Sequence, residues 1–144
     1  KREIFAEDIH ALVSDDVVDP AEDHYKLVAY SFRSETGEAP QAKLTVSSGG
    51  HEQLEESTGS GPVDATFKAI ERVAKSGSEL LLYSVNAITT GTDAQGEVTV
   101  RLMRDGRIVN GQGADTDIVV ASAKAYLNAL NKLHSGKEKL NPQL

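Results

Sequence analysis

The glycine-rich segment at residues 58–65 constrains the fold of this chain more than any other. Gly59 and Gly61 let the backbone turn where a side chain would clash, and Pro62 suits the first turn of a helix. Apolar residues then recur at helical spacing until Gly77, at Phe67, Ile70, Val73 and Ala74. The segment predicts a tight turn and a helix whose N-terminal N–H groups can attract a carboxylate or a phosphate.

The same order of elements occurs on both sides of Gly77. Apolar runs, alternating or continuous, predict three strands before the glycine-rich loop and three after the first helix. The expected strands are residues 25–32, 42–47 and 51–57, then 80–88, 98–102 and 107–111. Gly49-Gly50 and Asp105-Gly106 are hairpin signals within the two sets. A second helix is expected to follow residues 113–117, with small residues on its buried face that permit close packing, at Ile118, Ala121, Ser122, Ala125, Ala129 and Leu133.

The sequence therefore predicts an α+β fold of two pseudo-symmetric βββα units, residues 22–77 and 78–135. Residues 1–21 predict a short helix that needs a surface to dock on, since a lone helix of this length is marginal in water. Residues 136–144 are expected to form a flexible tail. Because the sequence begins with Lys1 and its one methionine is Met103, we expect it to be part of a longer protein.

The composition argues against several classes of function. A formal net charge of −7 and the absence of Trp disfavour a nucleic-acid surface, which needs clustered Lys and Arg. The absence of Cys excludes disulfides, thiolate metal sites and thiol nucleophiles, and fits a cytoplasmic protein. No apolar run approaches membrane-spanning length. We expect a cytoplasmic domain with neither a nucleic-acid nor a membrane partner.

Motifs of catalysis and metal binding are missing from the sequence. No Lys-Ser or Lys-Thr follows Gly61 as a P-loop requires, and Thr58 and Pro62 stand where a nucleophile elbow needs glycine. The histidines are scattered and are expected at separate surface positions, at His10, His24, His51 and His134. No pair of carboxylates suggests acid–base catalysis. We expect a non-catalytic chain without a metal site.

The loop before the second helix has a different chemistry from the first, because it carries Asp115 and Asp117. Backbone N–H groups at a helix end suit a carboxylate, and aspartates suit an ammonium group. Apolar residues expected between the two loops are Val63, Leu80, Tyr83, Ala87 and Ile118. This set complements a small zwitterion with an aliphatic side chain, such as a free amino acid. The alternative is that the glycines only form a turn and the aspartates only cap a helix, and spacing alone favours this alternative.

Four segments carry a resemblance to a known family: residues 59–65 (GSGPVDA), 83–85 (YSV), 91–96 (GTDAQG) and 113–125 (GADTDIVVASAKA). Over residues 22–135 the chain resembles the C-terminal regulatory domain of 2-isopropylmalate synthases, and residues 1–20 resemble the end of the linker subdomain that precedes it. Enzymes of that family condense acetyl-CoA with 3-methyl-2-oxobutanoate in the first committed step of leucine biosynthesis. Their divalent metal and catalytic residues lie in an N-terminal (β/α)8 barrel, which this chain lacks.

The resemblance implies a homodimeric regulatory domain that binds free leucine for feedback inhibition and holds no cofactor of its own. By position, it implies that the ligand contacts are Ser60, Gly61, Pro62, Val63, Asp64, Leu80, Tyr83, Ala87, Ala94, Asp115, Thr116, Asp117 and Ile118. The apolar members would surround the aliphatic side chain, and the loop amides and aspartates would hold the zwitterionic end. Asp64 departs from some relatives, which have a small apolar residue there.

Two alternatives stay open. The regulatory domain of citramalate synthase shares the architecture and responds to isoleucine, and an apolar pocket separates such ligands by only about 1–3 kcal/mol. The second alternative is a dimerisation module without a working effector site.

Overall fold

The structure is a computed structural model that describes residues 23–87 and 94–140. The helix expected in residues 1–21, the loop at residues 88–93 and the last four residues lie outside the described part. The described residues form two βββα units, as the sequence predicts.

The first unit is a three-stranded antiparallel sheet in the order β1-β2-β3, followed by a helix. Its elements are β1 (Tyr25–Arg33), β2 (Gln41–Ser48), β3 (His51–Thr58) and α2 (Pro62–Ala74). The alternation in β2 buries Ala42, Leu44 and Val46 on one face. Gly49 and Gly50 adopt positive φ angles of 60° and 91°, which is the backbone conformation that a tight hairpin between β2 and β3 requires.

The second unit repeats this plan in the order β4-β5-β6. Its elements are β4 (Glu79–Ala87), β5 (Gly96–Arg104), β6 (Arg107–Asp115) and α3 (Ile118–Leu140). Val98, Val100 and Leu102 of β5 are fully buried, as their alternation predicts. Helix α3 continues beyond residue 135 into the segment expected to be a tail, and it is much longer than α2, with 23 residues against 13.

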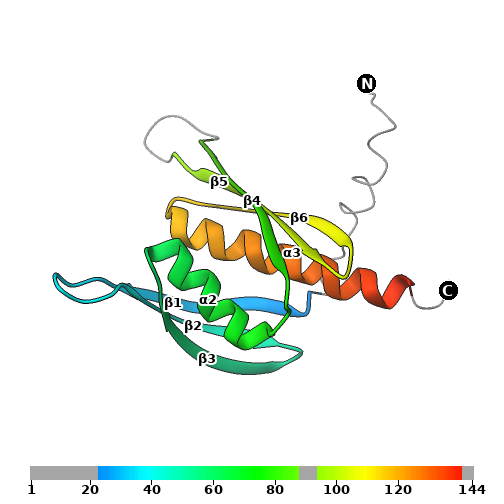
Figure 1. The fold of residues 1–144 in the computed structure, drawn as a ribbon, viewed down its shortest axis with the longest axis horizontal. Coiled ribbons are helices and arrows are strands. Elements are labelled where there is room, and N and C mark those ends of the chain that lie inside the picture. Colours follow the sequence, from blue (N-terminus) through cyan, green and yellow to red (C-terminus); the bar gives the residue numbers. More distant parts are fainter. Residues whose placement is uncertain (1–22, 88–93, 141–144) are drawn as a thin grey trace.

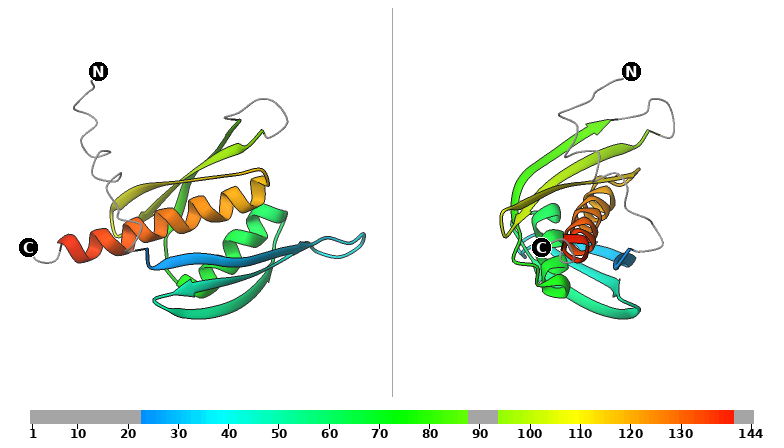
Figure 2. Two further views of the ribbon diagram at one scale, coloured as in Figure 1. Left: turned by 180° about the vertical axis from the view of Figure 1, so that it is seen from behind. Right: turned by 90° about the vertical axis from the view of Figure 1, so that its right-hand side faces the viewer.

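The two helices lie between the two sheets (Figures 1 and 2). Helix α2 packs on β2 and β3 of its own unit, whereas α3 packs on β5 and β6 and also reaches β1 of the first unit. One continuous core joins the units, and its largest buried side chains are Leu44, Ile70, Leu102, Leu130 and Leu133. No helix in the described part of the chain is both long enough and apolar enough to cross a membrane.

Strand β6 lies directly against the backbone of α3. A Cβ atom on Gly111 would lie 2.2 Å from the carbonyl oxygen of Ala125, and one on Gly113 would lie 2.5 Å from that of Ala121. No side chain fits at either position. The small residues expected on this helix face therefore do allow close packing, but the partners that make it possible are glycines of the preceding strand.

The start of β1 is held by the second half of α3. The buried Asn131 side chain accepts hydrogen bonds from the backbone N–H groups of His24 (3.0 Å) and Tyr25 (2.7 Å), and it donates one to the carbonyl oxygen of Tyr25 (3.0 Å). The rings of His24 and His134 stack with centroids 4.2 Å apart. Both histidines, each expected at the surface, are partly buried, and the length of α3 brings them together.

Replacing Gly111 with alanine is expected to destabilise the fold by about 1–3 kcal/mol, the usual cost of overpacking. The added methyl group would force β6 away from the α3 backbone. Gln112→Ala, at the exposed neighbouring position, is the matched control and should change the free energy of unfolding by less than about 0.5 kcal/mol. Urea denaturation followed by circular dichroism measures both, and equal effects would contradict the close approach as the cause.

Candidate ligand-binding site

Helix α2 begins without a side-chain cap. Gly61 is the N-cap residue, with extended backbone (φ −167°), and Pro62 occupies the first helical position. The carboxylate of Asp64 reaches back and accepts the backbone N–H of Ser60 at 2.9 Å. A side chain at Gly59 would collide with this carboxylate and with the backbone of Ala65, both 2.6 Å from its Cβ. The glycine loop is therefore closed down onto the first turn of α2. Its N-cap offers the helix only the carbonyl oxygen of Gly61, which accepts the backbone N–H of Ala65 at 2.9 Å, and no side-chain oxygen.

Helix α3 begins with carboxylates instead. The side chain of Asp117 accepts the backbone N–H of Val119 at 2.8 Å, which is an N-cap contact. Asp115 accepts the backbone N–H of Asp117 at 2.9 Å and forms an ion pair with Lys124 at 3.2 Å. The capping function considered as the alternative is therefore present at Asp117, whereas Asp115 binds the backbone of the N-cap residue itself. The contact with Val119 uses one oxygen of Asp117, whereas both oxygens of Asp115 are engaged, one by the Asp117 N–H and the other by Lys124.

The carboxylates of both loops are stabilised in the charged form. The hydrogen bond from the Ser60 N–H is the main cause that lowers the pKa of Asp64, and the bond to Lys68 (3.1 Å) adds to it. The Asp117 N–H has the same effect on the pKa of Asp115, with Lys124 again adding to it. Both loops thus keep their closed geometry through ionised carboxylates.

A pseudo-symmetric pair of hydroxyl contacts lies next to the two helix starts. The Tyr83 hydroxyl on β4 is 2.8 Å from the Ser122 hydroxyl, which donates to the Ile118 carbonyl oxygen at 2.8 Å. In the first unit, the Thr66 hydroxyl lies 3.3 Å from the Tyr30 hydroxyl on β1 and 2.7 Å from the Pro62 carbonyl oxygen. Each unit therefore fixes a tyrosine of its first strand to the first turn of its own helix.

The sequence hypothesis included Tyr83 but missed three members of these contacts, Tyr30, Thr66 and Ser122. An alignment of the two units on their strands would have paired the two tyrosines, because each lies two residues after an irregularity in strand pairing, at Val28 in β1 and at Leu81 in β4.

These tyrosines also connect the units. Burial raises the pKa of Tyr30, and the hydrogen bond with Thr66 opposes this rise. The negative charge of Asp117 raises the pKa further, so the start of α3 acts electrostatically on a tyrosine of the first unit. The ring of Tyr83 meets Phe67 of α2 edge-on, with centroids 5.9 Å apart. The two helix starts and the two tyrosines therefore form one region of the molecule.

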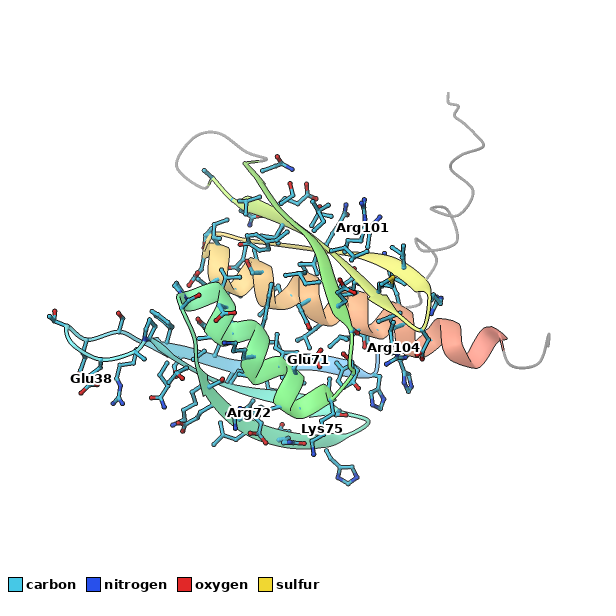
Figure 3. The ribbon with its side chains drawn as sticks, in the orientation of Figure 1. Glu38, Glu71, Arg72, Lys75, Arg101 and Arg104 are labelled. Atoms are coloured by element: carbon cyan, nitrogen blue, oxygen red, sulfur yellow. The ribbon has the colours of Figure 1, made fainter. Side chains whose placement is uncertain are left out.

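A cavity of about 400 Å³ lies beside α2, next to this region. It is lined by Asp64, Phe67, Lys68, Glu71, Arg72, Ser78, Leu80 and Tyr126. Its apolar wall and the charged side chains at its rim suit an amphipathic occupant. Figure 3 shows Glu71 between the two helix ribbons, near the middle of the molecule.

Glu71 organises the polar part of this cavity. Its carboxylate accepts the Tyr126 hydroxyl at 2.8 Å and the backbone N–H of Ser76 at 3.0 Å. Burial raises the pKa of Tyr126, and the charge of Glu71 and the hydrogen bond to it raise it further, so the hydroxyl stays protonated as a donor. The contact ties α2 to α3 across the core.

The structure does not bring all the expected contact residues into one cavity. Asp64 and Leu80 line the cavity, Tyr83 of β4 contacts Ser122 of α3, and the Ile118 side chain packs over Gly96. The exposed members of the set are Ser60, Pro62, Ala94, Thr116 and Asp117, and the other partly buried members are Gly61, Val63 and Asp115. Ala87 is the last residue of β4. In residues 23–87 and 94–140, no group of three or more His, Cys, Asp or Glu side chains could hold a metal ion.

The arrangement corresponds to a known domain family. Residues 3–134 match the LeuA allosteric (dimerisation) domain. The chain belongs to this family.

Three similar proteins are all named 2-isopropylmalate synthase. The chain is 72% identical over its whole length to a 2-isopropylmalate synthase of Aromatoleum aromaticum, and 65% identical over its whole length to that of Nitrosospira multiformis. It is 66% identical, over 99% of its length, to the 2-isopropylmalate synthase of Dechloromonas aromatica. The chain spans 28% of the length of each of these three relatives.

The loops of this LeuA allosteric domain should loosen in acid. Because the folded-state pKa values of Asp64 and Asp115 lie below the ordinary 3.8, their contribution to stability is present above that value and is lost as the pH falls through the lowered pKa. The double variant Asp64→Asn/Asp115→Asn keeps amide acceptors but does not titrate. It should lose less stability than the wild type between about pH 5 and about pH 3.

Asp105→Asn, on the β5–β6 turn, is the control for this comparison. It should follow the wild-type pH dependence in urea unfolding. If the double variant also followed the wild type, the two carboxylates would not be coupled to folding.

Proposed function

We propose that this chain is the regulatory region of a 2-isopropylmalate synthase and that it binds free leucine for feedback inhibition. The observation that carries the proposal is the match of residues 3–134 to the LeuA allosteric domain. It is supported by the 72% identity of the chain to a 2-isopropylmalate synthase. The parent reaction would be the condensation of acetyl-CoA with 3-methyl-2-oxobutanoate. The divalent metal and the catalytic residues would belong to a part of the longer protein outside this chain.

The two helix starts support a zwitterionic ligand because their chemistry is opposite. The α2 end has a glycine N-cap, so its N–H groups suit the ligand carboxylate. The α3 end carries Asp115 and Asp117, whose charges suit the ligand ammonium group. Tyr83 of β4 lies beside the start of α3, and Leu80 of β4 adds apolar surface to the cavity along α2. Leucine combines a carboxylate, an ammonium group and an aliphatic side chain in one small molecule.

The proposal includes two properties of the whole protein. The chain associates as a homodimer, in keeping with the name of its domain family. Leucine inhibits by binding one arrangement of the dimer more tightly than another, since a ligand with equal affinity for both would shift nothing. The proposal also includes a cytoplasmic location for the protein.

Calorimetric titration of the chain with leucine, isoleucine and valine tests the ligand. Leucine is expected to bind, with isoleucine weaker by about tenfold or more, the discrimination that one misplaced methyl group gives in an apolar pocket. Binding of isoleucine without leucine at millimolar concentration would indicate the citramalate synthase function instead. Binding of none of the three would indicate a dimerisation module without an effector site.

Separate Asp115→Asn and Asp117→Asn variants test the ammonium contact. Asparagine retains the N-cap hydrogen bond, so the fold is kept while the charge is removed. At least one of the two variants should weaken leucine binding by about 10- to 100-fold, the equivalent of a charged hydrogen bond worth about 1.5–3 kcal/mol.

Asp105→Asn is the matched control, because asparagine also tolerates the positive φ of 54° at that turn. It should bind leucine as the wild type does. Unchanged affinity in both loop variants would mean that the aspartates serve only as helix caps.

A further inference from the structure

Helix α3 lies between free edges of the two sheets. Strands β1 and β6 are each the outermost strand of their sheet, and within the described sheets no strand pairs with their outer sides. Seen from behind, α3 has β6 along one side and β1 along the other (Figure 2), and it packs on both strands. Free edges carry unpaired N–H and C=O groups that can pair with a strand of another chain, so proteins usually protect them. In this fold α3 is the element placed to protect both edges.

Two side chains of α3 occupy the outer edge of β6. In an antiparallel pair, alternate residues turn their backbone groups away from the neighbouring strand. The Asn128 side chain accepts the backbone N–H of Gln112 at 3.0 Å, and the Lys132 ammonium group donates to the carbonyl oxygen of Asn110 at 2.7 Å. A strand lying beside β6 would offer one acceptor and one donor to these same two groups. Asn128 and Lys132 therefore take the place of such a strand.

A third side chain of the same helix closes the start of β1. The Asn131 side chain accepts the backbone N–H of Tyr25 at 2.7 Å and donates to the carbonyl oxygen of Tyr25 at 3.0 Å. This is the pair of bonds that a directly opposite residue of an antiparallel strand would form. Because Asn131 is only 4% exposed, the contact is shielded from water.

These three residues form the polar ridge of α3 (Asn128, Asn131 and Lys132). They are three and four residues apart along the helix, which places them at neighbouring positions on its surface. Asparagine is a poor helix former because its side chain competes for backbone hydrogen bonds, so two asparagines in the interior of α3 weaken the helix by themselves. Their bonds to the strand edges give a physical reason for their presence.

Two other contacts fix the position of the ridge along β6. Gly111, in the middle of the strand, lies directly against the helix backbone at Ala125. At the start of β6, the Arg107 guanidinium group donates to the carbonyl oxygens of Lys132 and Leu133, both at 3.2 Å. The ridge is therefore held opposite the same backbone groups of the strand.

We propose that the polar ridge of α3 is a built-in block to strand addition. It fills hydrogen-bonding positions that a fourth strand would use at each sheet, and it keeps β1 and β6 from pairing with an extended segment of another chain, including a second copy of this one. Lys132 also places a positive charge at the edge of β6, a common protection of edge strands. The block does not depend on the proposed ligand or on the proposed homodimer.

Backbone hydrogen exchange, followed by NMR in the complete chain, tests the contact itself. Asn128→Ala should speed exchange of the Gln112 N–H by about fivefold or more, the factor that corresponds to a hydrogen bond worth about 1 kcal/mol. The N–H of Gly111, which by the same alternation faces β5, is the internal control and should be unaffected. An unchanged rate at Gln112, or an equal increase at both residues, would overturn the proposal.

The double variant Asn128→Ala/Lys132→Ala tests the block. Alanine is the best helix former, so α3 is retained while the edge of β6 is opened. The variant should form larger species that scatter light and bind thioflavin T, at a concentration at which the wild type keeps its own mass. Asn128→Asp/Lys132→Arg retains an acceptor and a donor at the same positions and should behave as the wild type does.

Ile70→Val controls for a general loss of stability, because it removes one methyl group from the core and leaves both edges unchanged. If Ile70→Val associated as strongly as the double alanine variant, unfolding would be the cause and the block would be refuted. The block would also be refuted by a double alanine variant that keeps the wild-type mass although its Gln112 N–H exchanges faster, since the edge would then be open without pairing.

Discussion

The close approach of β6 to α3 is the contact on which the rest of the structure depends. With no side chain on Gly111 and Gly113, the strand rests on the helix backbone itself, and Ala125 and Ala129 keep that face of the helix flat. The helix is thereby fixed along most of its length. Its first turn receives the Tyr83 hydroxyl through Ser122, and its second half holds the start of β1 through Asn131. A shift of α3 would therefore change both the candidate ligand site and the start of β1.

The strands, hairpins and helix starts followed from local patterns, because alternation in β2 and β5 and the glycines of the turns act within a few residues. The contacts between the two units could not be predicted from local patterns. The stacking of His24 on His134 depends on the length of α3, and the contact of Glu71 with Tyr126 depends on how two helices cross. The capping role of Asp117 was foreseen as an alternative, since it too is local. The candidate site was thus predictable where a loop makes it and unpredictable where side chains from distant elements meet.

Unequal helix lengths make the two units chemically different despite their common plan. Helix α3 is long enough to serve both sheets, whereas α2 covers only β2 and β3. Strand β1 therefore has a helix packed on it from the other unit, whereas β4 stays exposed beside the cavity of about 400 Å³ that α2 lines. A duplicated fold that were fully symmetric would bury both first strands equally and would offer no such surface.

The two helix starts also differ, because α3 has a side-chain cap and α2 has none. This difference determines which helix start a ligand could stabilise. At α3 the capping groups belong to the protein, so this end is already satisfied before any ligand arrives. At α2 the N-cap glycine supplies no side-chain acceptor, and a bound carboxylate would complete the helix end. A ligand that completes a helix stabilises the folded state by mass action, by about 2.7 kcal/mol at a hundred times its dissociation constant. Since Phe67 of α2 contacts Tyr83, and Tyr83 contacts α3, ordering of the α2 start would be transmitted to the helix that joins both units.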